Sequence, residues 1–325
     1  MSRRMTGPSP SEPEILAFQA ECDGFYPPDA VDASVAQQRA WYDALCRRFD
    51  TPYPQGLTAE DESMAGVPVR RYRPAAPSNP RVDRHAPSQG PGDPAAAPPT
   101  VLYFHGGGFV VGSLDSHDGI CADLAQASGL ELVATDYRLL PEHPWPAAAD
   151  DAFTVARALI VSGRRLIVAG DSAGGTLAAG LALRARDAGL VGIVGQVLVY
   201  PGLGGDLSSG SFVEMADAPG LTTADVRYYR ELVGAAHDDA IAHPLHATSL
   251  AGLPSAYITA AHFDPLRDDA RHYAARLAEA GIDVTFREEP QMVHAWLRAR
   301  RTSPGAAAGF EAICRALRRL ADQAG

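Results

Sequence analysis

The chain has 325 residues, of which 46% are hydrophobic, so it is long enough to form one large α/β domain or two smaller domains with a sizeable core. Its 28 basic residues are outnumbered by 39 acidic ones, and the net charge of −11 argues against nucleic acid and anionic membranes as partners. Every basic residue is arginine. The absence of lysine excludes Schiff-base chemistry, a Ser-Lys dyad and a P-loop.

The cysteines and the N-terminus limit which cellular compartments and which cofactors we expect for this protein. The four cysteines lie far apart, without the C-x-x-C spacing of zinc or redox sites: Cys22, Cys46, Cys121 and Cys314. We expect free thiols, mostly buried, and neither a metal nor a cofactor. The N-terminus lacks the apolar core of a signal peptide, and no later apolar run is long enough to span a membrane. We therefore expect a soluble, cytoplasmic protein without a stable membrane anchor.

The first hundred residues change character three times. Residues 14–50 have helical spacing of apolar side chains, and residues 57–74 show the alternation of strands, with the arginines predicted to face outward. Residues 75–99 are rich in proline, alanine, serine and glycine, which predicts a mobile surface loop.

From residue 101 onward, strand and helix patterns alternate. The predicted strands are 101–104, 131–136, 166–169, 196–200, 255–260 and 283–288, and the predicted helices are 118–128, 147–161, 173–188, 268–280 and a final one near the C-terminus. This alternation predicts an α/β fold with a mostly parallel central sheet flanked by helices. It is interrupted after Pro201 by an insertion, whose helix begins near Thr222 with Asp225 placed as in a capping box.

The segment from Gly170 to Gly174, with Ser172 at its centre, has the pattern of a nucleophile elbow. A predicted strand precedes it and a predicted helix follows it. Glycines on both sides permit a sharp turn because they have no β-carbon. The context favours a catalytic serine over an ordinary turn.

A serine hydroxyl needs a base and an orienting acid. His294 is the best placed of ten histidines, because it follows the last predicted strand after a short loop, 289–293. The rivals in or just after the insertion are His237, His243 and His246. For the acid we favour Asp264, after the strand ending near residue 260, over Asp268 and Asp269, whose place in a first helical turn suits the helix dipole.

The run from His105 to Gly108 follows the first predicted parallel strand directly. The backbone N–H groups of Gly107, Gly108 and Ala173 can together stabilise the oxyanion of an acyl-transfer intermediate. An ordinary glycine turn is the alternative. A dinucleotide-binding loop does not fit, because Val111 stands where its third glycine would be.

Taken together, these motifs make the chain similar to bacterial members of the hormone-sensitive lipase family of α/β-hydrolases. The resemblance covers roughly residues 60–300 and includes the segments 105–109, 136–144, 170–175 and 264–268 together with His294. It implies a fold of about eight strands with a helical cap. It also implies Ser172 as nucleophile, His294 as base and Asp264 as acid, with His105 structural.

The resemblance further divides the chain into an N-terminal helical cap segment, 1–54, and a catalytic domain, 55–325, which carries a second cap segment at about 203–245 and the flexible loop 75–99. It implies hydrolysis of short- to medium-chain acyl esters, a small-molecule ester as partner and a possible homodimer. Thr176, Ala295 and His262 depart from the usual family residues without removing a catalytic group.

Two alternatives stay open at this point. The same triad and oxyanion donors serve hydrolases of amides, carbamates or lactones. A non-catalytic ligand-binding member of the fold is the other alternative, against which the presence of His294 argues.

Overall fold

One mixed sheet positions every functional segment of the chain. The computed structural model describes residues 9–27, 30, 33–75 and 97–324, and in these residues eight strands form a sheet of order β1-β2-β4-β3-β5-β6-β7-β8. The strands are β1 (Thr58–Met64), β2 (Val67–Arg73), β3 (Thr100–Phe104), β4 (Leu132–Thr135), β5 (Leu166–Asp171), β6 (Ile193–Val199), β7 (Ser255–Phe263) and β8 (Val284–Val293). The β1–β2 and β2–β4 pairs are antiparallel and the others are parallel, as the alternating pattern predicts.

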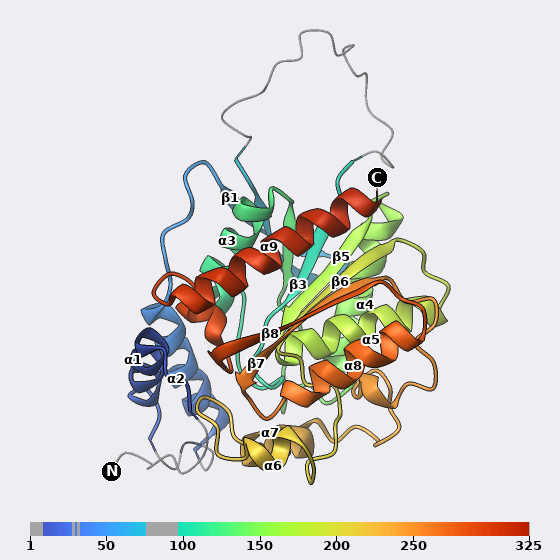
Figure 1. The fold of residues 1–325 in the computed structure, drawn as a ribbon. Coiled ribbons are helices and arrows are strands. Elements are labelled where there is room, and N and C mark those ends of the chain that lie inside the picture. Colours follow the sequence, from blue (N-terminus) through green and yellow to red (C-terminus); the bar gives the residue numbers. More distant parts are fainter. Residues whose placement is uncertain (1–8, 28–29, 31–32, 76–96, 325) are drawn as a thin grey trace.

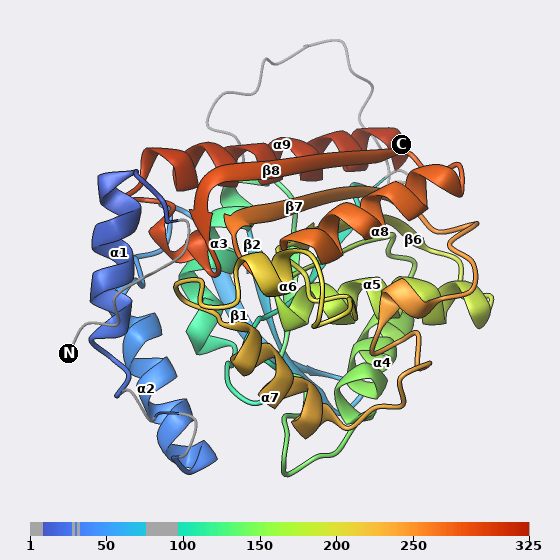
Figure 2. The ribbon, with the colours of Figure 1, turned by 60° about the horizontal axis from the view of Figure 1, so that its bottom comes forward.

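Helices cover both faces of this sheet (Figures 1 and 2). They are α1 (Pro13–Asp23), α2 (Val35–Arg48), α3 (Asp118–Ser128), α4 (Ala147–Val161), α5 (Ala173–Asp187), α6 (Ser211–Glu214), α7 (Thr223–Val233), α8 (Arg267–Glu279) and α9 (Pro304–Ala324), with short 3-10 turns at Asp115–His117, Pro244–His246 and Trp296–Ala299. Apolar side chains of α4, α5 and α8 form one core with the sheet, and those of α1, α3 and α9 form the other. The central strands β3, β4 and β5 are buried along their whole length, as expected for parallel strands covered on both faces.

One expectation for β2 is wrong, because helices cover both faces of the sheet. Its arginines were predicted to face outward, yet Arg71 is only 8% exposed. Arg71 lies on the same side of the strand as Val67 and Val69, and it ion-pairs with Glu62 at 2.5 Å and Glu131 at 2.7 Å. A buried guanidinium is tolerated there because two carboxylates compensate its charge.

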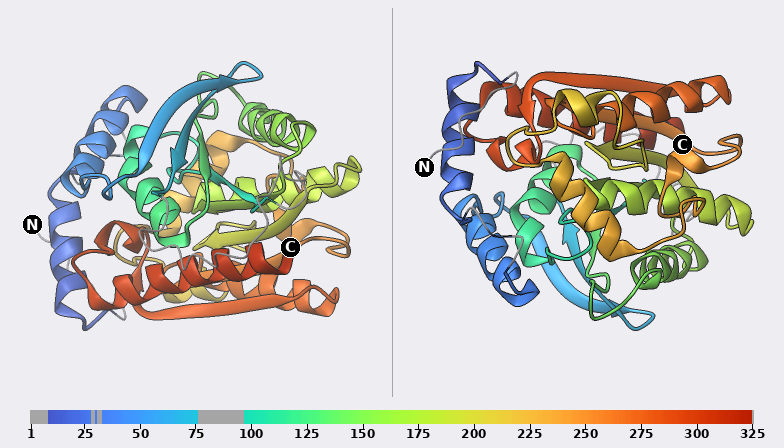
Figure 3. Two further views of the ribbon diagram at one scale, coloured as in Figure 1. Left: turned by 90° about the horizontal axis from the view of Figure 1, so that it is seen from above. Right: turned by 90° about the horizontal axis from the view of Figure 1, so that it is seen from below.

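The two segments predicted to form a cap meet at one end of the sheet. Helices α1 and α2, and α6 and α7 of the insertion, lie beyond the ends to which the parallel strands point (Figures 1 and 3). Helix α7 begins with the expected capping box, since the Thr222 hydroxyl accepts a bond from the Asp225 N–H and the Asp225 carboxylate accepts one from the Thr222 N–H. Most of the loop predicted at 75–99 lies outside the described residues.

No helix within the described ranges combines the length and the apolar character that crossing a bilayer requires.

Candidate active site

Ser172 lies in a strained turn between β5 and α5. Its φ of +53° is unusual for a residue with a side chain. A β-carbon on Gly174 would come within 2.0 Å of the Phe104 carbonyl oxygen, and one on Gly170 within 2.3 Å of the Gly174 carbonyl oxygen. Both glycines are therefore required for the close approach of β3, β5 and α5 that holds the serine at the end of the sheet.

The structure brings Ser172, His294 and Asp264 into one line of contacts. His294 Nε2 lies 2.9 Å from the Ser172 hydroxyl oxygen, and His294 Nδ1 lies 2.7 Å from Asp264 Oδ2. Asp264 is fully buried and its other oxygen accepts a bond of 2.8 Å from the Leu266 N–H. A carboxylate at Nδ1 holds the proton on that nitrogen and leaves Nε2 free to accept the serine proton.

The two strands that precede the predicted acid and the predicted base are longer than expected. β7 extends to Phe263 and β8 to Val293, so Asp264 and His294 follow them directly rather than after short loops. The last strand was predicted to end at residue 288, whereas β8 continues through Pro290, which cannot donate a ladder hydrogen bond. In the structure β8 is an edge strand, and Pro290 falls where its register with β7 is irregular, so no donor is missed there.

The rival acids have other partners. Asp269 is buried and accepts bonds from the backbone N–H groups of Leu203, Gly204 and Gly205 at 2.6, 3.1 and 3.3 Å. Asp268 accepts a bond of 2.8 Å from the Ser211 N–H. Both carboxylates thus bind the start of the insertion to α8, a role that no local sequence pattern indicates.

The rival histidines form a group of their own. The ring centroid of His246 lies 4.3 Å from that of His237 and 5.6 Å from that of His243. His262, whose role the sequence left open, places Nδ1 2.6 Å from Glu288 Oε1 on the neighbouring strand. Among the histidines in the described ranges, His294 is the one that contacts Ser172.

The glycine run after β3 turns back beside the elbow. Gly107 has a φ of +126° and Gly108 a φ of +60°, and the Gly107 carbonyl accepts 3.0 Å bonds from both the Val110 and the Val111 N–H. A β-carbon on Gly108 would lie 2.4 Å from the Tyr229 ring of α7. Ala173 is the first residue of α5, where the backbone N–H has no acceptor within the helix.

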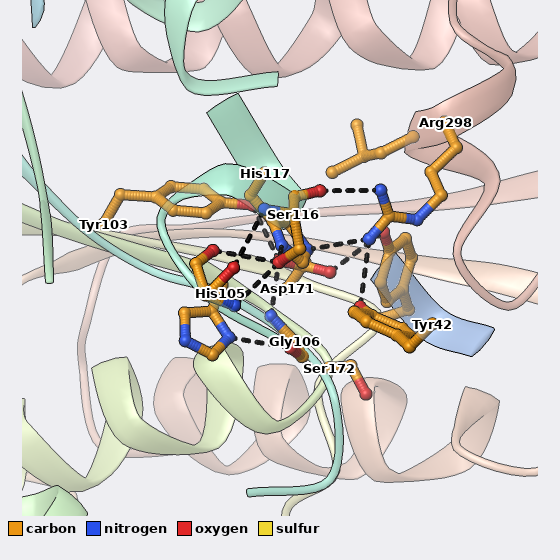
Figure 4. A network of polar contacts seen from close by, with 12 residues as sticks. Tyr42, Tyr103, His105, Gly106, Ser116, His117, Asp171, Ser172 and Arg298 are labelled. Atoms are coloured by element: carbon orange, nitrogen blue, oxygen red, sulfur yellow. Dashed lines mark hydrogen bonds and ion pairs between the residues drawn. The ribbon is translucent and has the colours of Figure 1, made fainter. Parts of the chain in front are cut away.

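A buried carboxylate joins the glycine run to the elbow (Figure 4). Asp171, next to the serine, accepts bonds from the Tyr103 hydroxyl at 2.8 Å, the Gly106 N–H at 3.0 Å and the Tyr200 hydroxyl at 3.4 Å, and His117 Nε2 lies 3.4 Å away. Burial alone would raise the pKa of Asp171, but His117, the Tyr103 hydroxyl and Arg298 outweigh it and hold the pKa below its ordinary value. The carboxylate therefore stays ionised and fixes Gly106 relative to Ser172.

The compensating charge comes from Arg298, four residues after His294. Arg298 is 7% exposed, and it donates to the Ser116 carbonyl at 2.9 Å and the Tyr42 hydroxyl at 3.0 Å, with Nη2 3.4 Å from His117 Nε2 (Figure 4). His117 thus lies between the buried anion of Asp171 and this cation. No sequence motif marks Arg298, His117 or Tyr42, because tertiary packing alone brings them together.

We expect the buried histidines to make stability dependent on pH. Burial, and secondly the neighbouring His117, lowers the pKa of His105 from 6.5 to about 3. Below pH 6.5 the unfolded chain binds a proton there that the folded protein does not. The free energy of unfolding therefore decreases as the pH is lowered from 6.5 to 3, by about 1.4 kcal/mol per pH unit for this one group.

Urea unfolding at pH 7, 6 and 5 measures this slope. His105→Asn removes the group and is expected to flatten the slope, whereas His143→Gln, at an exposed position, leaves it unchanged. Equal slopes for the wild type and His105→Asn would contradict the prediction.

The described part of the chain contains no group of three or more His, Cys, Asp or Glu side chains arranged to hold a metal ion. The chemistry that this arrangement can perform is the transfer of an acyl group to a serine activated by histidine.

Comparisons with known proteins point the same way. A family described as alpha/beta hydrolase fold matches residues 101–298. Esterase LipI of Mycobacterium tuberculosis is 45% identical over 65% of this chain and 69% of its own length, and carboxylesterase NlhH of the same organism is 41% identical over 67% and 74%. The crystal structure of a thermostable esterase from Pseudomonas putida ECU1011 superposes with a TM-score of 0.84 at 26% identity, covering 97% of this chain and 99% of that one. This protein belongs to the hormone-sensitive lipase family of α/β-hydrolases.

Proposed function

We propose that the protein hydrolyses short- to medium-chain acyl esters through an acyl-enzyme intermediate on Ser172. The protein is a carboxylic ester hydrolase, in keeping with relatives at 33–45% identity. The observation that carries the proposal for the site is the pair of contacts made by His294, 2.9 Å to the Ser172 hydroxyl and 2.7 Å to the Asp264 carboxylate. Both distances lie within the range required for a nucleophile, a base and its orienting acid.

In the proposed reaction, His294 Nε2 takes the serine proton as Oγ attacks the ester carbonyl carbon. The carbonyl oxygen becomes an oxyanion and accepts bonds from the N–H groups of Gly107, Gly108 and Ala173. His294 then gives its proton to the departing alcohol, which leaves Ser172 acylated. A water molecule, activated by the same histidine, releases the acid and restores the serine. Asp264 stabilises the imidazolium that forms in each step.

The cap segments are proposed to limit acyl length. The predicted segments 1–54 and about 203–245 supply α2 and α7, and the Gln38 side chain of α2 donates a bond of 3.2 Å to the Tyr228 hydroxyl of α7. Tyr229, on the same helix, packs against Gly108 of the proposed oxyanion hole. Bulky side chains beside the proposed oxyanion hole favour small acyl groups. The homodimer and the cytoplasmic location stay predictions.

A series of p-nitrophenyl esters tests the substrate class. We expect the largest kcat/KM for acetate or butyrate, a lower value for octanoate and little turnover of palmitate, because the cap restricts the space beyond the acyl carbonyl. The matching p-nitroanilides separate esters from amides. Faster cleavage of palmitate than of butyrate, or of an anilide than of its ester, would contradict the proposed substrate.

A fluorophosphonate probe tests the nucleophile separately. Peptide mapping of the labelled protein is expected to find one phosphonylated residue, Ser172. A folded protein that takes up no label would support a non-catalytic member of the fold instead.

A further inference from the structure

The loop that carries the proposed oxyanion donors is held by several elements. The His105 carbonyl accepts a bond of 2.7 Å from the Tyr137 hydroxyl, and the Phe109 carbonyl one of 2.8 Å from the Leu140 N–H. The Gly106 N–H is held by Asp171 at 3.0 Å. The elbow and the segment 137–142 thus fix the loop on two sides, which leaves its far end, at Val110, to be fixed from elsewhere.

Arg39 of α2 fixes that far end. Its Nε donates to the Val110 carbonyl at 2.8 Å and its Nη2 to the Leu140 carbonyl at 2.8 Å. The same guanidinium makes two bonds to Glu142, of 2.9 and 2.7 Å. One side chain therefore joins the glycine loop to the segment 137–142, using the planar fork of donors that only arginine provides.

The bonds to the two carbonyls differ in kind from the bonds to Glu142. The Glu142 side chain is 53% exposed, so its ion pair with Arg39 contributes little to stability. The Arg39 side chain is 29% exposed, but the two residues whose carbonyls it binds, Val110 and Leu140, are both buried. The Val110 carbonyl belongs to the turn closed by the Val110 and Val111 N–H groups on Gly107, so a shift at Val110 moves Gly107 directly.

We propose that Arg39 is a positioning residue for the oxyanion hole, through which the N-terminal helix α2 sets the orientation of the Gly107 and Gly108 N–H groups. The inference rests on the proposed function, because it assigns Arg39 a task in the same site. Oxyanion donors act only if they are fixed before charge develops on the substrate. Loss of Arg39 therefore weakens binding of the transition state while leaving binding of the ground-state ester nearly unchanged.

Arg39→Gln and Arg39→Lys are the test variants, with p-nitrophenyl butyrate as substrate. For Arg39→Gln we expect kcat to fall about 10- to 100-fold, as for a small misplacement of catalytic groups. KM is expected to change by less than about threefold. Arg39→Lys is expected to fall between the wild type and Arg39→Gln, because an ammonium can hold one carbonyl but not both.

Two controls separate the effect of the carbonyl hydrogen bonds from the effects of the positive charge and of the ion pair. Arg47→Gln removes the same charge from an exposed position of the same helix and is expected to leave kcat unchanged. Glu142→Gln removes the ion pair and keeps both carbonyl bonds, so its loss is expected to be small. Equal losses in Glu142→Gln and Arg39→Gln would overturn the proposal, because the ion pair alone would then account for the effect.

The inhibition constant of a trifluoromethyl ketone distinguishes a positioning role of Arg39 from a merely structural one. Its adduct with the serine carries an oxyanion, so its inhibition constant is expected to rise in Arg39→Gln by the factor by which kcat/KM falls. Labelling to completion with a fluorophosphonate counts the competent sites. A loss of activity matched by an equal loss of labelled sites, with an unchanged inhibition constant, would overturn the proposal.

These outcomes are separate from failure of the proposed function. If the wild type does not hydrolyse esters, or Ser172→Ala does, the proposed function fails. If the wild type is active, Ser172→Ala is inactive and Arg39→Gln keeps the wild-type kcat, then only the role of Arg39 is overturned.

Discussion

Ser172→Ala is expected to lower kcat for p-nitrophenyl butyrate about 10⁵- to 10⁶-fold, which is the size of loss seen when a triad serine is removed. Alanine has no atom that can attack the carbonyl carbon, and within the described part of the chain Ser172 supplies the hydroxyl that lies 2.9 Å from His294 Nε2. What activity is left comes from water attacking a substrate that the oxyanion donors still bind. Initial rates from freshly purified variant, compared with the uncatalysed reaction, measure the loss.

The matched control is Ser208→Ala, which removes an exposed hydroxyl of the insertion whose partner is Asp206. We expect its rate to equal that of the wild type. Ser172→Ala is also expected to unfold at the wild-type urea concentration, since Ser172 Oγ makes its contact with a ring that Asp264 already holds. A variant that is folded and keeps more than a hundredth of the wild-type kcat would refute Ser172 as nucleophile.

The elements that the sequence predicts well are those whose signal is local. Helices α3 and α4 match their predicted bounds, because apolar residues recur with helical spacing over their whole length. The elbow is predictable for this reason only in part. Gly170 is required by its contact with Gly174 in the same strand-turn-helix unit, whereas Gly174 is required by Phe104 at the end of the neighbouring strand β3.

The ends of the strands could not be predicted as well. β7 and β8 run three and five residues beyond their expected ends at residues 260 and 288, because pairing between them continues through a stretch with weak strand propensity. Pro290 does not end β8, since its missing donor matters only in a strand paired on both edges and β8 is an edge strand. The direct attachment of Asp264 and His294 to β7 and β8 places both side chains more rigidly than loops would.

The polar groups around the elbow depend on contacts between distant segments. Asp171 reads as part of a short motif, but the groups that stabilise its charge come from Tyr103, His117 and, further away, Arg298. Arg298 and Arg39 are ordinary arginines in the sequence, in a chain whose basic residues are all arginine. Their carbonyl and hydroxyl partners become visible only once the fold brings α2 against the loops at the end of the sheet.

Asp264→Asn is expected to lower kcat about 10⁴-fold, the loss found when a triad carboxylate becomes an amide. The Leu266 N–H, which donates to Asp264 Oδ1, requires an acceptor there and so turns the oxygen of the amide toward Leu266. The NH₂ group then faces His294 Nδ1 and can only donate to it. The ring must place its proton on Nε2, where it can no longer accept the serine proton.

The rival carboxylate provides the comparison for this variant. Asp268 is four residues away at the start of α8, and Asp268→Asn removes its ion pairs with Arg267 and Arg271 without touching His294. We expect Asp268→Asn to change kcat less than about tenfold, since it removes no group from the proposed triad. Rates for both variants on the same ester decide between them. A larger loss in Asp268→Asn than in Asp264→Asn would reverse the assignment of the acid, because only a residue that sets the tautomer of His294 can affect the chemical step so strongly.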